Sequence, residues 1–344
     1  MRDTATPTGP GPLLLVGDVG GTKTDLAVVG PGEGPRRRLA YRRYASREYA
    51  RLEDIVRDFR SDLGDLDVEA ACIDVAGPVM AGTARLTNLP WRLSEADLAR
   101  DLGLRHAWLI NDLVATAAAV PLLGPDELDV VQDGQGLPGG AIAVLAPGTG
   151  LGEAFLTHDV DGYRPQASEG GHSAFSPSGE LELALLRHLW GRFEHVSVER
   201  VASGIGIPNV YEFLRDERGM AESPALAARV GGVGDRAYPI IEAATDPAAP
   251  DPLASATVDL VLRILGTEAA NLALKVMATG GIYLAGGIAQ RLRDRIPASG
   301  FLDALRSSGR FRSTLECVPV AVVRGEVALL GAAAEGLRRL GGAG

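Results

Sequence analysis

We predict an α/β protein built as two halves, from three observations on the sequence. Short apolar runs alternate along the chain with segments of helical spacing, as in strands connected by helices. The plan of apolar strand, glycine-rich turn and second strand occurs at 13–29 and again at 141–157. The length of 344 residues fits two domains. A duplicated unit at the head of each half suggests a nucleotide held between the halves.

The first half is expected to open with strands at 13–17 and 25–29, separated by a glycine-rich turn. A helix is expected over 49–62, where Leu52, Ile55, Val56 and Phe59 have helical spacing. The other elements expected here are strands at 38–45, 70–76 and 107–110, a helix capped by Ser94 with Asp97 and ending at Leu102, and an alanine-rich helix at 113–120.

The second half is expected to follow a loop at 121–140, which is rich in Gly, Pro, Asp and Gln and is interpreted as a domain boundary. The segment 221–251 is rich in Ala, Gly and Pro and is expected to be an irregular insertion. The other elements expected here are strands at 141–146, 153–157 and 281–285, mostly helical structure over 179–215, a long amphipathic helix at 252–278 and a closing helix at 326–340.

The charge balance argues against large anionic partners. The chain has 34 Lys and Arg against 44 Asp and Glu, a net charge of −10, so we expect no binding to nucleic acid or to an anionic membrane. The basic cluster at 36–43 is interpreted as a solvated edge of a strand or loop.

Cysteine usage and the first residues predict a cytoplasmic protein. Cys72 and Cys317 lie in apolar runs, lack zinc spacing and are expected to be buried free thiols. No run approaches the roughly 18 apolar residues of a membrane span. The segment 1–12 is rich in Thr, Pro and Gly, lacks the apolar stretch of a signal peptide and is expected to be a disordered tail.

Three glycine-rich segments are candidates for binding phosphate, because successive backbone N–H groups of a tight turn can point at one anion. Each segment alone could be a plain turn, so the prediction of phosphate binding depends on the three segments together. A Walker A loop is excluded because Lys23 follows Thr22 rather than Gly, and the dinucleotide fingerprint fails at Glu153. The candidates are Gly20, Gly21 and Thr22, Gly148, Thr149 and Gly150, and Gly286 and Gly287.

Polar residues near these turns could take part in chemistry. Asp18 directly follows a strand, where it could meet a phosphate-bound Mg²⁺ through water, and Lys23 could touch phosphate. The alternatives are an ordinary turn aspartate and a solvated lysine. Asn111 and Asp112 lie at the carboxyl end of a strand, where α/β proteins gather ligand sites. Asp112 could instead cap the next helix.

A further group lies in the second half. Glu169 and His172 flank two glycines, which can hold both side chains close to one ligand. Glu199, judged on its local sequence alone, is more typical of a charge on a helix surface. The remaining histidines have no metal spacing and are interpreted as structural; they are His106, His158, His188 and His195.

Seven motifs follow one another in a fixed order along the chain. They are D-V-G-G-T-K-T at 18–24, L-T-N-L-P-W at 86–91, N-D at 111–112, G-T-G-L-G at 148–152, E-G-G-H at 169–172, H-V-S-V-E-R at 195–200 and L-A-G-G-I at 284–288. With them the chain resembles the bacterial glucokinase family, of the hexokinase and actin-like ATPase superfamily, from about Leu13 to Leu340.

The resemblance implies an α/β fold of the actin-like ATPase (ribonuclease H-like) class, with two domains and a nucleotide and sugar cleft between them that closes on the sugar. The implied small domain is 13–122, the large domain is 123–325, and a C-terminal helix at about 326–341 returns to the small domain.

The resemblance also implies roles for residues. The segments 18–24 and 148–152 correspond to two phosphate loops and 284–288 to the adenosine side. Asp112 matches the catalytic base, and Asn88 with the Gly77-Pro78 turn would shape the sugar pocket. The implied sugar ligands are Asn111, Asp112, Glu169, His172 and Glu199.

The implied activity is ATP-dependent phosphorylation of D-glucose to glucose 6-phosphate, in cytoplasmic glycolysis, by a homodimer. The implied cofactors are ATP and Mg²⁺; the metal is carried by ATP, and zinc is not implied. Lys23, where close glucokinases often have Asn, and Ser173-Ala174 after His172 depart from common versions and leave the sugar open.

Several alternatives therefore stay open. They are mannose or glucosamine as acceptor, polyphosphate as donor, a sugar sensor without turnover, and an actin-like ATPase that needs no sugar. No helix-turn-helix precedes Leu13, so a sugar-sensing repressor is not expected.

Overall fold

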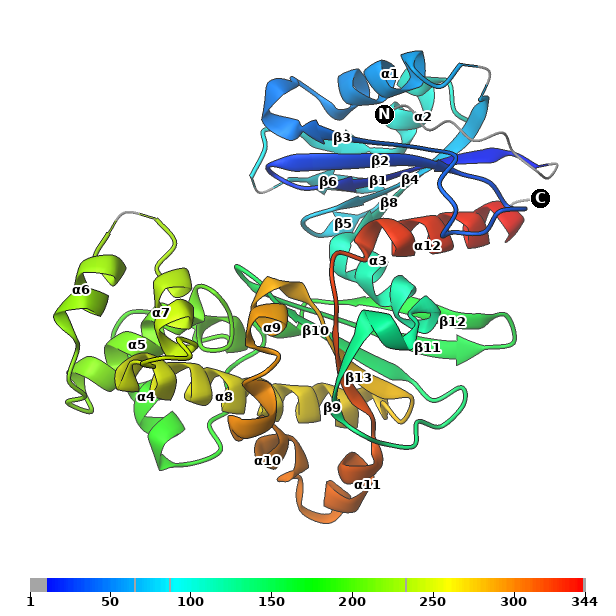
Figure 1. Ribbon diagram of the computed structural model, residues 1–344. Coiled ribbons are helices and arrows are strands. Elements are labelled where there is room, and N and C mark those ends of the chain that lie inside the picture. The colour runs from blue at the N-terminus through cyan, green and yellow to red at the C-terminus, as the bar shows by residue number, and fades with distance from the viewer. Residues whose placement is uncertain (1–10, 65, 87, 233, 343–344) are drawn as a thin grey trace. The chain divides into compact units, whose positions relative to one another are not determined.

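The computed structural model describes residues 11–64, 66–86, 88–232 and 234–342 (Figure 1). The predicted disordered tail falls almost wholly on residues 1–10, outside the described residues. The chain forms two compact units: Met1–Leu123 together with Glu326–Gly344 make the first, and Gly124–Gly325 make the second.

The first unit is built on a five-stranded sheet. Its strands are β1 (Leu13–Val19), β2 (Lys23–Val29), β3 (Ala40–Ala45), β4 (Val68–Val75) and β8 (His106–Asn111). They lie in the order β3-β2-β1-β4-β8, with β1 antiparallel to β2 and parallel to β4. Apolar side chains on both faces of β1 and β4 are buried, which explains why these strands read as nearly continuous apolar runs.

Helices cover both faces of this sheet. They are α1 (Leu52–Ser61), α2 (Glu95–Leu102), α3 (Asp112–Ala119) and α12 (Ala328–Gly342). Figure 1 shows α1 and α2 on one face and α3 and α12 on the other. The predicted cap of α2 is present, since the Ser94 hydroxyl accepts the N–H of Asp97 at 3.4 Å. A small sheet adds β5 (Val79–Met80), β6 (Thr83–Arg85) and β7 (Arg92–Ser94).

The C-terminal helix α12 belongs to the core of the first unit. It packs against β1, β4 and α3. Leu329, Ala332 and Ala333 of α12 lie in one buried cluster with Leu14 and Cys72 of the sheet. The second face of the sheet is therefore covered by α3 together with α12, the last described helix.

The second unit repeats the strand order of the first sheet and adds a sixth strand. Its strands are β9 (Leu128–Gln132), β10 (Ile142–Pro147), β11 (Leu151–Asp159), β12 (Gly162–Ser168), β13 (Gly281–Leu284) and β14 (Val320–Val323). Their order is β12-β11-β10-β13-β14-β9, in which β9 is the added strand and is antiparallel to β14. As in β3-β2-β1-β4-β8, an antiparallel meander is followed by two parallel neighbours. The repeated strand–turn–strand plan in the sequence corresponds to β1–β2 and β10–β11.

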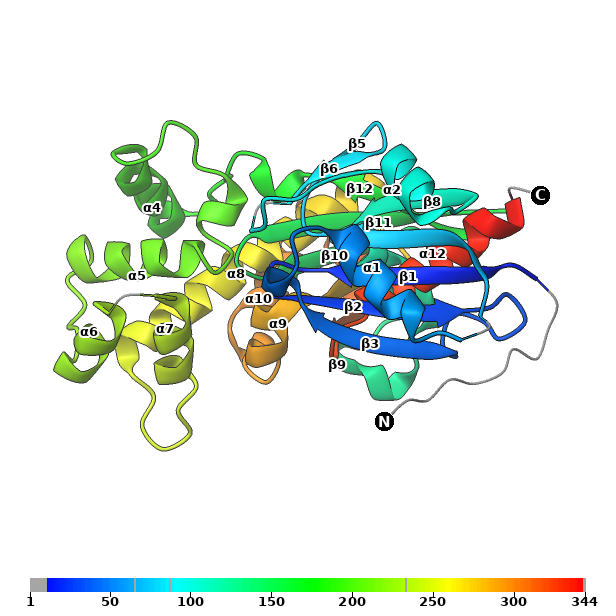
Figure 2. The ribbon, with the colours of Figure 1, turned by 90° about the horizontal axis from the view of Figure 1, so that it is seen from above.

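Most of the helices in the described ranges lie in the second unit. They are α4 (Glu180–Trp190), α5 (Gly206–Asp216), α6 (Pro224–Val230), α7 (Ala237–Ala244), α8 (Pro252–Val276), α9 (Gly286–Leu292), α10 (Phe301–Arg306) and α11 (Arg312–Cys317). Figure 2 shows α4–α7 gathered together beside α8. The α5, α7 and α10 helices all pack on α8, which explains why so much of this long helix is buried.

Two local expectations are wrong. The segment 121–140 is not a loop throughout, because it contains β9, whose backbone is paired by β14 at the edge of the sheet. The segment 221–251 is not irregular, because it contains α6 and α7. Ser223 caps α6 by accepting the N–H of Leu226, and Leu226 and Ile240 are buried in the core.

The structure also bears on the predictions made for the cysteines and for the basic cluster at 36–43. Cys72 is buried, but Cys317 is exposed, because it ends α11 before the apolar strand begins. The arginines of 36–43 lie on β3 or just before it, and Arg42 and Arg43 pair with Asp62 and Asp25 at 2.5 and 2.7 Å. Within the described ranges, no helix combines the length and apolar character needed to cross a membrane.

Candidate functional site

The first glycine-rich turn connects Val19 of β1 to Thr24 of β2. The Gly20 N–H donates to the Lys23 carbonyl at 2.9 Å and closes the turn. Ser46 holds the turn from outside, because its hydroxyl donates to the Gly20 carbonyl at 2.8 Å and its N–H to the Thr22 carbonyl at 3.0 Å. The carbonyls are thus engaged, while the side chain of Thr22 stays exposed.

Two further predicted residues lie at this turn. Asn88 packs against it so closely that a Cβ placed on Gly21 would lie 2.5 Å from the Asn88 Cβ, so the approach requires glycine. Lys23 forms an ion pair with Glu326, from the segment just before α12. The side chain of Lys23 is 34% exposed in this ion pair, so the alternative of a solvated lysine stays open.

Carboxyl groups gather at the ends of the central strands of the first unit. Asp18 and Asp74 face each other across the parallel pair of β1 and β4. Burial raises the pKa of Asp18; Asp25 adds to the rise and Lys23 opposes it. Burial, followed by the charges of Asp18 and Asp112, raises the pKa of Asp74 well above its ordinary value.

Asp74 is a residue that the sequence reasoning missed. It is fully buried, and neither of its side-chain oxygens accepts a bond from an N–H or hydroxyl within the described residues. Asp18 lies opposite it across β1 and β4. Burial and the charges of Asp18 and Asp112 raise the pKa of Asp74 well above its ordinary value, which favours the neutral form of this carboxyl. The available signal was an aspartate inside the apolar run 70–76.

Asn111 and Asp112 lie next to each other at the end of β8 but have different roles. Asn111, not Asp112, is the N-cap of α3: its Oδ1 accepts the N–H groups of Leu113 and Val114 at 2.9 and 3.3 Å. Its Nδ2 donates to the Gly77 carbonyl at 3.0 Å, which ties the predicted Gly77-Pro78 turn to this strand end. Asp112 is therefore not the N-cap of α3, which was the alternative expected from the sequence.

Asp112 has the protonation behaviour of a base. Burial raises its pKa to about 6; the hydrogen bond from the Leu113 N–H lowers it, and the charge of Asp18 raises it further. A carboxylate with this pKa is ionised at neutral pH and is a better proton acceptor than an ordinary aspartate.

The second glycine-rich turn, in the other unit, connects Pro147 of β10 to Leu151 of β11. The Gly148 N–H donates to the Gly150 carbonyl at 2.8 Å. The turn opens onto a cavity of about 580 Å³, which lies within the usual range for small-molecule sites. The lining includes the predicted Gly148, Thr149 and Gly287, together with Tyr238 of α7 and Arg291 of α9. The predicted Gly286 starts α9 beside this lining.

Glu169, His172 and Glu199 form a cluster in the second unit. The Nε2 of His172 lies 3.9 Å from Oε2 of Glu169, and its Nδ1 lies 3.9 Å from Oε1 of Glu199. Glu199 lies in a short 3₁₀ turn, with its side chain 17% exposed, so the reading of it as a helix-surface charge is wrong. Its Oε2 accepts the N–H of Leu151 at 3.0 Å, next to the second glycine-rich turn.

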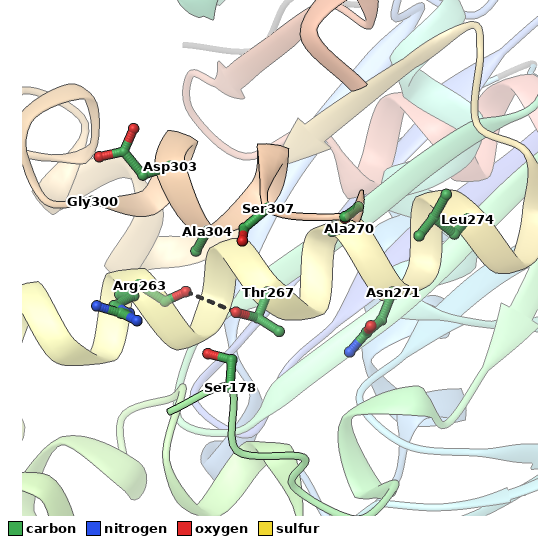
Figure 3. Close-up of a pocket in the computed structure, with 11 residues that line it drawn as sticks. Ser178, Arg263, Thr267, Ala270, Asn271, Leu274, Gly300, Asp303, Ala304 and Ser307 are labelled. Carbon is green, nitrogen blue, oxygen red and sulfur yellow. Dashed lines mark hydrogen bonds between the residues drawn. The ribbon is translucent and has the colours of Figure 1, made fainter. Parts of the chain in front are cut away.

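Another cavity contains none of the predicted residues. It has a volume of about 460 Å³ and lies between α8 and α10, with Arg263, Thr267 and Asn271 on the α8 side (Figure 3). Because its lining shares no residue with the clusters described above, we do not assign it to the candidate site.

The described residues contain no group of three or more His, Cys, Asp or Glu side chains that could hold a metal ion. Asp18, at the open end of β1 and beside other carboxyls, fits a single contact to a cation that arrives with a ligand.

The chain is similar to known proteins over nearly its whole length. The family model for Glucokinase matches residues 15–338. A glucokinase from Nostoc punctiforme is 38% identical over 334 residues, which cover 93% of this chain and 98% of that protein. The crystal structure of a glucokinase from an Antarctic psychrotroph has a TM-score of 0.81 at 28% identity and covers 96% of this chain and 100% of that one.

A more distant structure shows the same fold. It is a ROK family glucokinase from Streptomyces griseus in complex with glucose and AMPPNP, with a TM-score of 0.59 at 23% identity, covering 95% of this chain and 99% of that one. These similarities confirm the predicted α/β fold class of actin-like sugar kinases and the resemblance drawn from the seven motifs.

Proposed function

This chain belongs to the glucokinase family, and on that premise we propose that it transfers the γ-phosphoryl group of ATP to the 6-hydroxyl of D-glucose. The observation that carries the proposal is the state of Asp112. It stands at the end of β8 with its pKa raised to about 6, and Asn111 rather than Asp112 serves as the N-cap of α3.

Asp112 acts as the general base in this reaction. Its carboxylate takes the proton of the 6-hydroxyl while that oxygen attacks the γ-phosphorus, and the bond from the γ-phosphorus to the β–γ bridging oxygen breaks. The products are glucose 6-phosphate and ADP, and the proton leaves from Asp112. Phosphoryl transfer depends mainly on positioning and on neutralising charge, so the base orients the acceptor as much as it activates it.

The remaining sugar hydroxyls are bound by Asn111, Glu169, His172 and Glu199. The two distances of 3.9 Å from His172 to the glutamates exceed hydrogen-bond length, so these groups keep the capacity to bond to sugar hydroxyls. Carboxylates accept from hydroxyls and the imidazole can donate to one. A site that bonds several hydroxyls strongly rejects analogues that lack one.

The phosphates are bound by the two glycine-rich turns. The turn with Gly20, Gly21 and Thr22 and the turn with Gly148, Thr149 and Gly150 present backbone N–H groups and hydroxyls. The cavity beside the second turn takes the adenosine, next to Gly286 and Gly287. Lys23 reaches a phosphate by exchanging its ion pair with Glu326.

Asp18 would hold, through water, the Mg²⁺ that accompanies ATP. Bound there, the ion would supply neutralisation of phosphate charge. The proposal also includes a cytoplasmic enzyme of glycolysis that acts as a homodimer, in line with the frequency of two-fold assemblies. Light scattering on the purified protein measures the last of these directly.

The deciding experiment is ADP release from Mg-ATP with and without glucose, coupled to detection of glucose 6-phosphate. Glucose-dependent ADP matched by sugar phosphate supports the proposal. Turnover only with mannose or glucosamine, or only with polyphosphate, would change the substrate. Glucose binding without turnover from either donor would make the protein a sugar sensor, and sugar-independent ADP release would make it an ATPase.

A further inference from the structure

The segment 195–205 links the turn at 169–172 to the second glycine-rich turn within the second unit. At its start, the Val198 N–H donates to the Ser173 carbonyl at 3.0 Å. At its end, the N–H groups of Gly204 and Ile205 donate to the carbonyls of Gly148 and Thr149 at 2.8 and 3.0 Å. One short stretch of chain is thus hydrogen-bonded at one end beside the proposed sugar residues and at the other to the proposed phosphate turn.

Glu199 lies in the middle of this linking segment, and its two carboxylate oxygens face different partners. Oε2 accepts the Leu151 N–H at 3.0 Å, and Oε1 lies 3.9 Å from Nδ1 of His172. The backbone of Glu199 is fixed as well, since the buried Ser203 hydroxyl donates to its carbonyl at 2.7 Å. The carboxylate is planar, so reorienting one oxygen moves the other.

We propose that Glu199 couples sugar binding to the conformation of the second phosphate turn, so that glucose and ATP bind this unit cooperatively. The inference rests on the proposed function, because it takes a sugar hydroxyl as the partner of Oε1. A hydroxyl bonded to Oε1 fixes the carboxylate plane and so strengthens the bond from Oε2 to the Leu151 N–H. That bond holds the end of the turn whose N–H groups bind phosphate, and the coupling is reciprocal by linkage.

A substitution at Gly150 tests this coupling without changing Glu199 itself. A Cβ on Gly150 would overlap the Glu199 Oε2, so Gly150→Ala pushes the carboxylate away from Leu151 without removing any group proposed to touch sugar. Gly148, in the same turn, has no atom within 4 Å of an added Cβ. Gly148→Ala is therefore a matched control with the same chemical change and no displacement of Glu199.

The first test is calorimetric titration of each variant with glucose in the absence of nucleotide. Gly150→Ala raises the glucose Kd roughly tenfold or more, the size expected for disturbing one charged hydrogen bond, and Gly148→Ala leaves it unchanged. An unchanged glucose Kd in Gly150→Ala overturns the inference. So does an equal rise in both variants, because that reflects general damage to the turn. Circular dichroism and thermal unfolding confirm that the variants are folded.

A second measurement does not depend on Gly150. The Kd of AMPPNP is measured without glucose and at saturating glucose in the wild type, Glu199→Asp and Glu199→Gln. Glucose tightens AMPPNP binding in the wild type by roughly fivefold or more, within the usual range of coupling between sites. Aspartate keeps the charge but is too short to meet both partners, so the ratio falls to about one; glutamine keeps the length and retains part of it.

The outcomes separate the inference from the proposed function. A wild type that phosphorylates glucose but shows the same AMPPNP ratio as Glu199→Asp overturns the coupling and leaves the activity standing. A wild type that binds no glucose overturns the proposed function and the coupling with it.

Discussion

The two glycine-rich turns occupy the same place in two sheets that share the order of five strands, yet their surroundings differ. The first turn follows Asp18, which is paired with Asp25 across the hairpin and with Asp74 across the parallel neighbour. In the second hairpin, Ala146 is paired with Gly152. The first turn therefore has carboxyls of its own sheet beside it, whereas the corresponding pair of positions in the second hairpin has none. At the second turn the nearby carboxylate is that of Glu199, which lies far away along the chain and accepts the Leu151 N–H.

The difference teaches that a repeated backbone plan does not repeat its chemistry. Both turns offer N–H groups, because that property follows from the hairpin itself. In the first unit, burial and neighbouring carboxyl charges raise the pKa values of Asp18, Asp74 and Asp112. In the second unit, burial raises the pKa of Glu153 to about 8 and also raises that of Glu268. The second unit contributes the cluster of Glu169, His172 and Glu199, which we propose to bind the sugar hydroxyls.

The largest effect is expected for Asp112→Ala in the first unit. Removing a general base costs about 10²- to 10⁴-fold in kcat, and glucose binding should largely persist because the second unit is intact. Steady-state kinetics with calorimetric glucose titration measures both quantities. Asp101→Ala, on the exposed side of α2, is the control and should behave as the wild type. Near-normal turnover in Asp112→Ala would remove Asp112 from the role of base.

The second largest effect is expected on the pH dependence of kcat/KM. It should respond to a substitution in the first unit and not to one in the second. Asp112 must be ionised to accept a proton, so kcat/KM should fall about tenfold per pH unit below its pKa of about 6. The charge of Asp18 raises that pKa, so Asp18→Asn should move the acid limb to lower pH. Glu199→Gln, in the second unit, should leave the limb in place. A limb that stays fixed in Asp18→Asn would contradict the coupling between the two carboxyls.

Glu199→Gln is expected to act on sugar binding more than on chemistry. Loss of a charged hydrogen bond should raise the glucose KM roughly 10- to 100-fold, with a much smaller change in kcat. Initial rates over a glucose series at saturating ATP give both constants. An unchanged KM would return Glu199 to the role of a structural charge.

The smallest effect compares the turns directly. Thr22 and Thr149 both expose their side chains at the turn. Removing either hydroxyl in Thr22→Val or Thr149→Val should raise the KM for ATP by about two- to tenfold, the size of one neutral hydrogen bond, and leave the KM for glucose unchanged. If only one variant shows the effect, phosphate binding is concentrated in one turn and the equivalence of the two turns is broken.

Elements defined by local patterns could be predicted from the sequence. The strands β1 and β10, the capped helix α2 and the long helix α8 carry their signals in consecutive residues. The helices α6 and α7 could not be predicted, because their alanine- and proline-rich sequence is stabilised by tertiary burial of residues such as Leu226 and Ile240. β9 likewise depends on its partner β14.

The candidate site shows the same limit. The glycine turns and the pair Asn111 and Asp112 are recognisable as consecutive residues. Local sequence misread Glu199, because its environment comes from Leu151 and His172, which are far away along the chain. Asp74 was missed because its significance lies in facing Asp18 across the sheet, and a single strand does not reveal that pairing.

The return of α12 to the first sheet has a consequence for biosynthesis. All strands and helices of the second unit have been translated by residue 325. The face of the first sheet that carries Leu14 and Cys72 is completed only when Leu329, Ala332 and Ala333 of α12 have been translated. The half that is translated first is therefore the last to complete its core on the ribosome. Until then α3 covers only part of this apolar sheet face, and a chain that terminates early in α12 exposes the rest as a surface prone to aggregation.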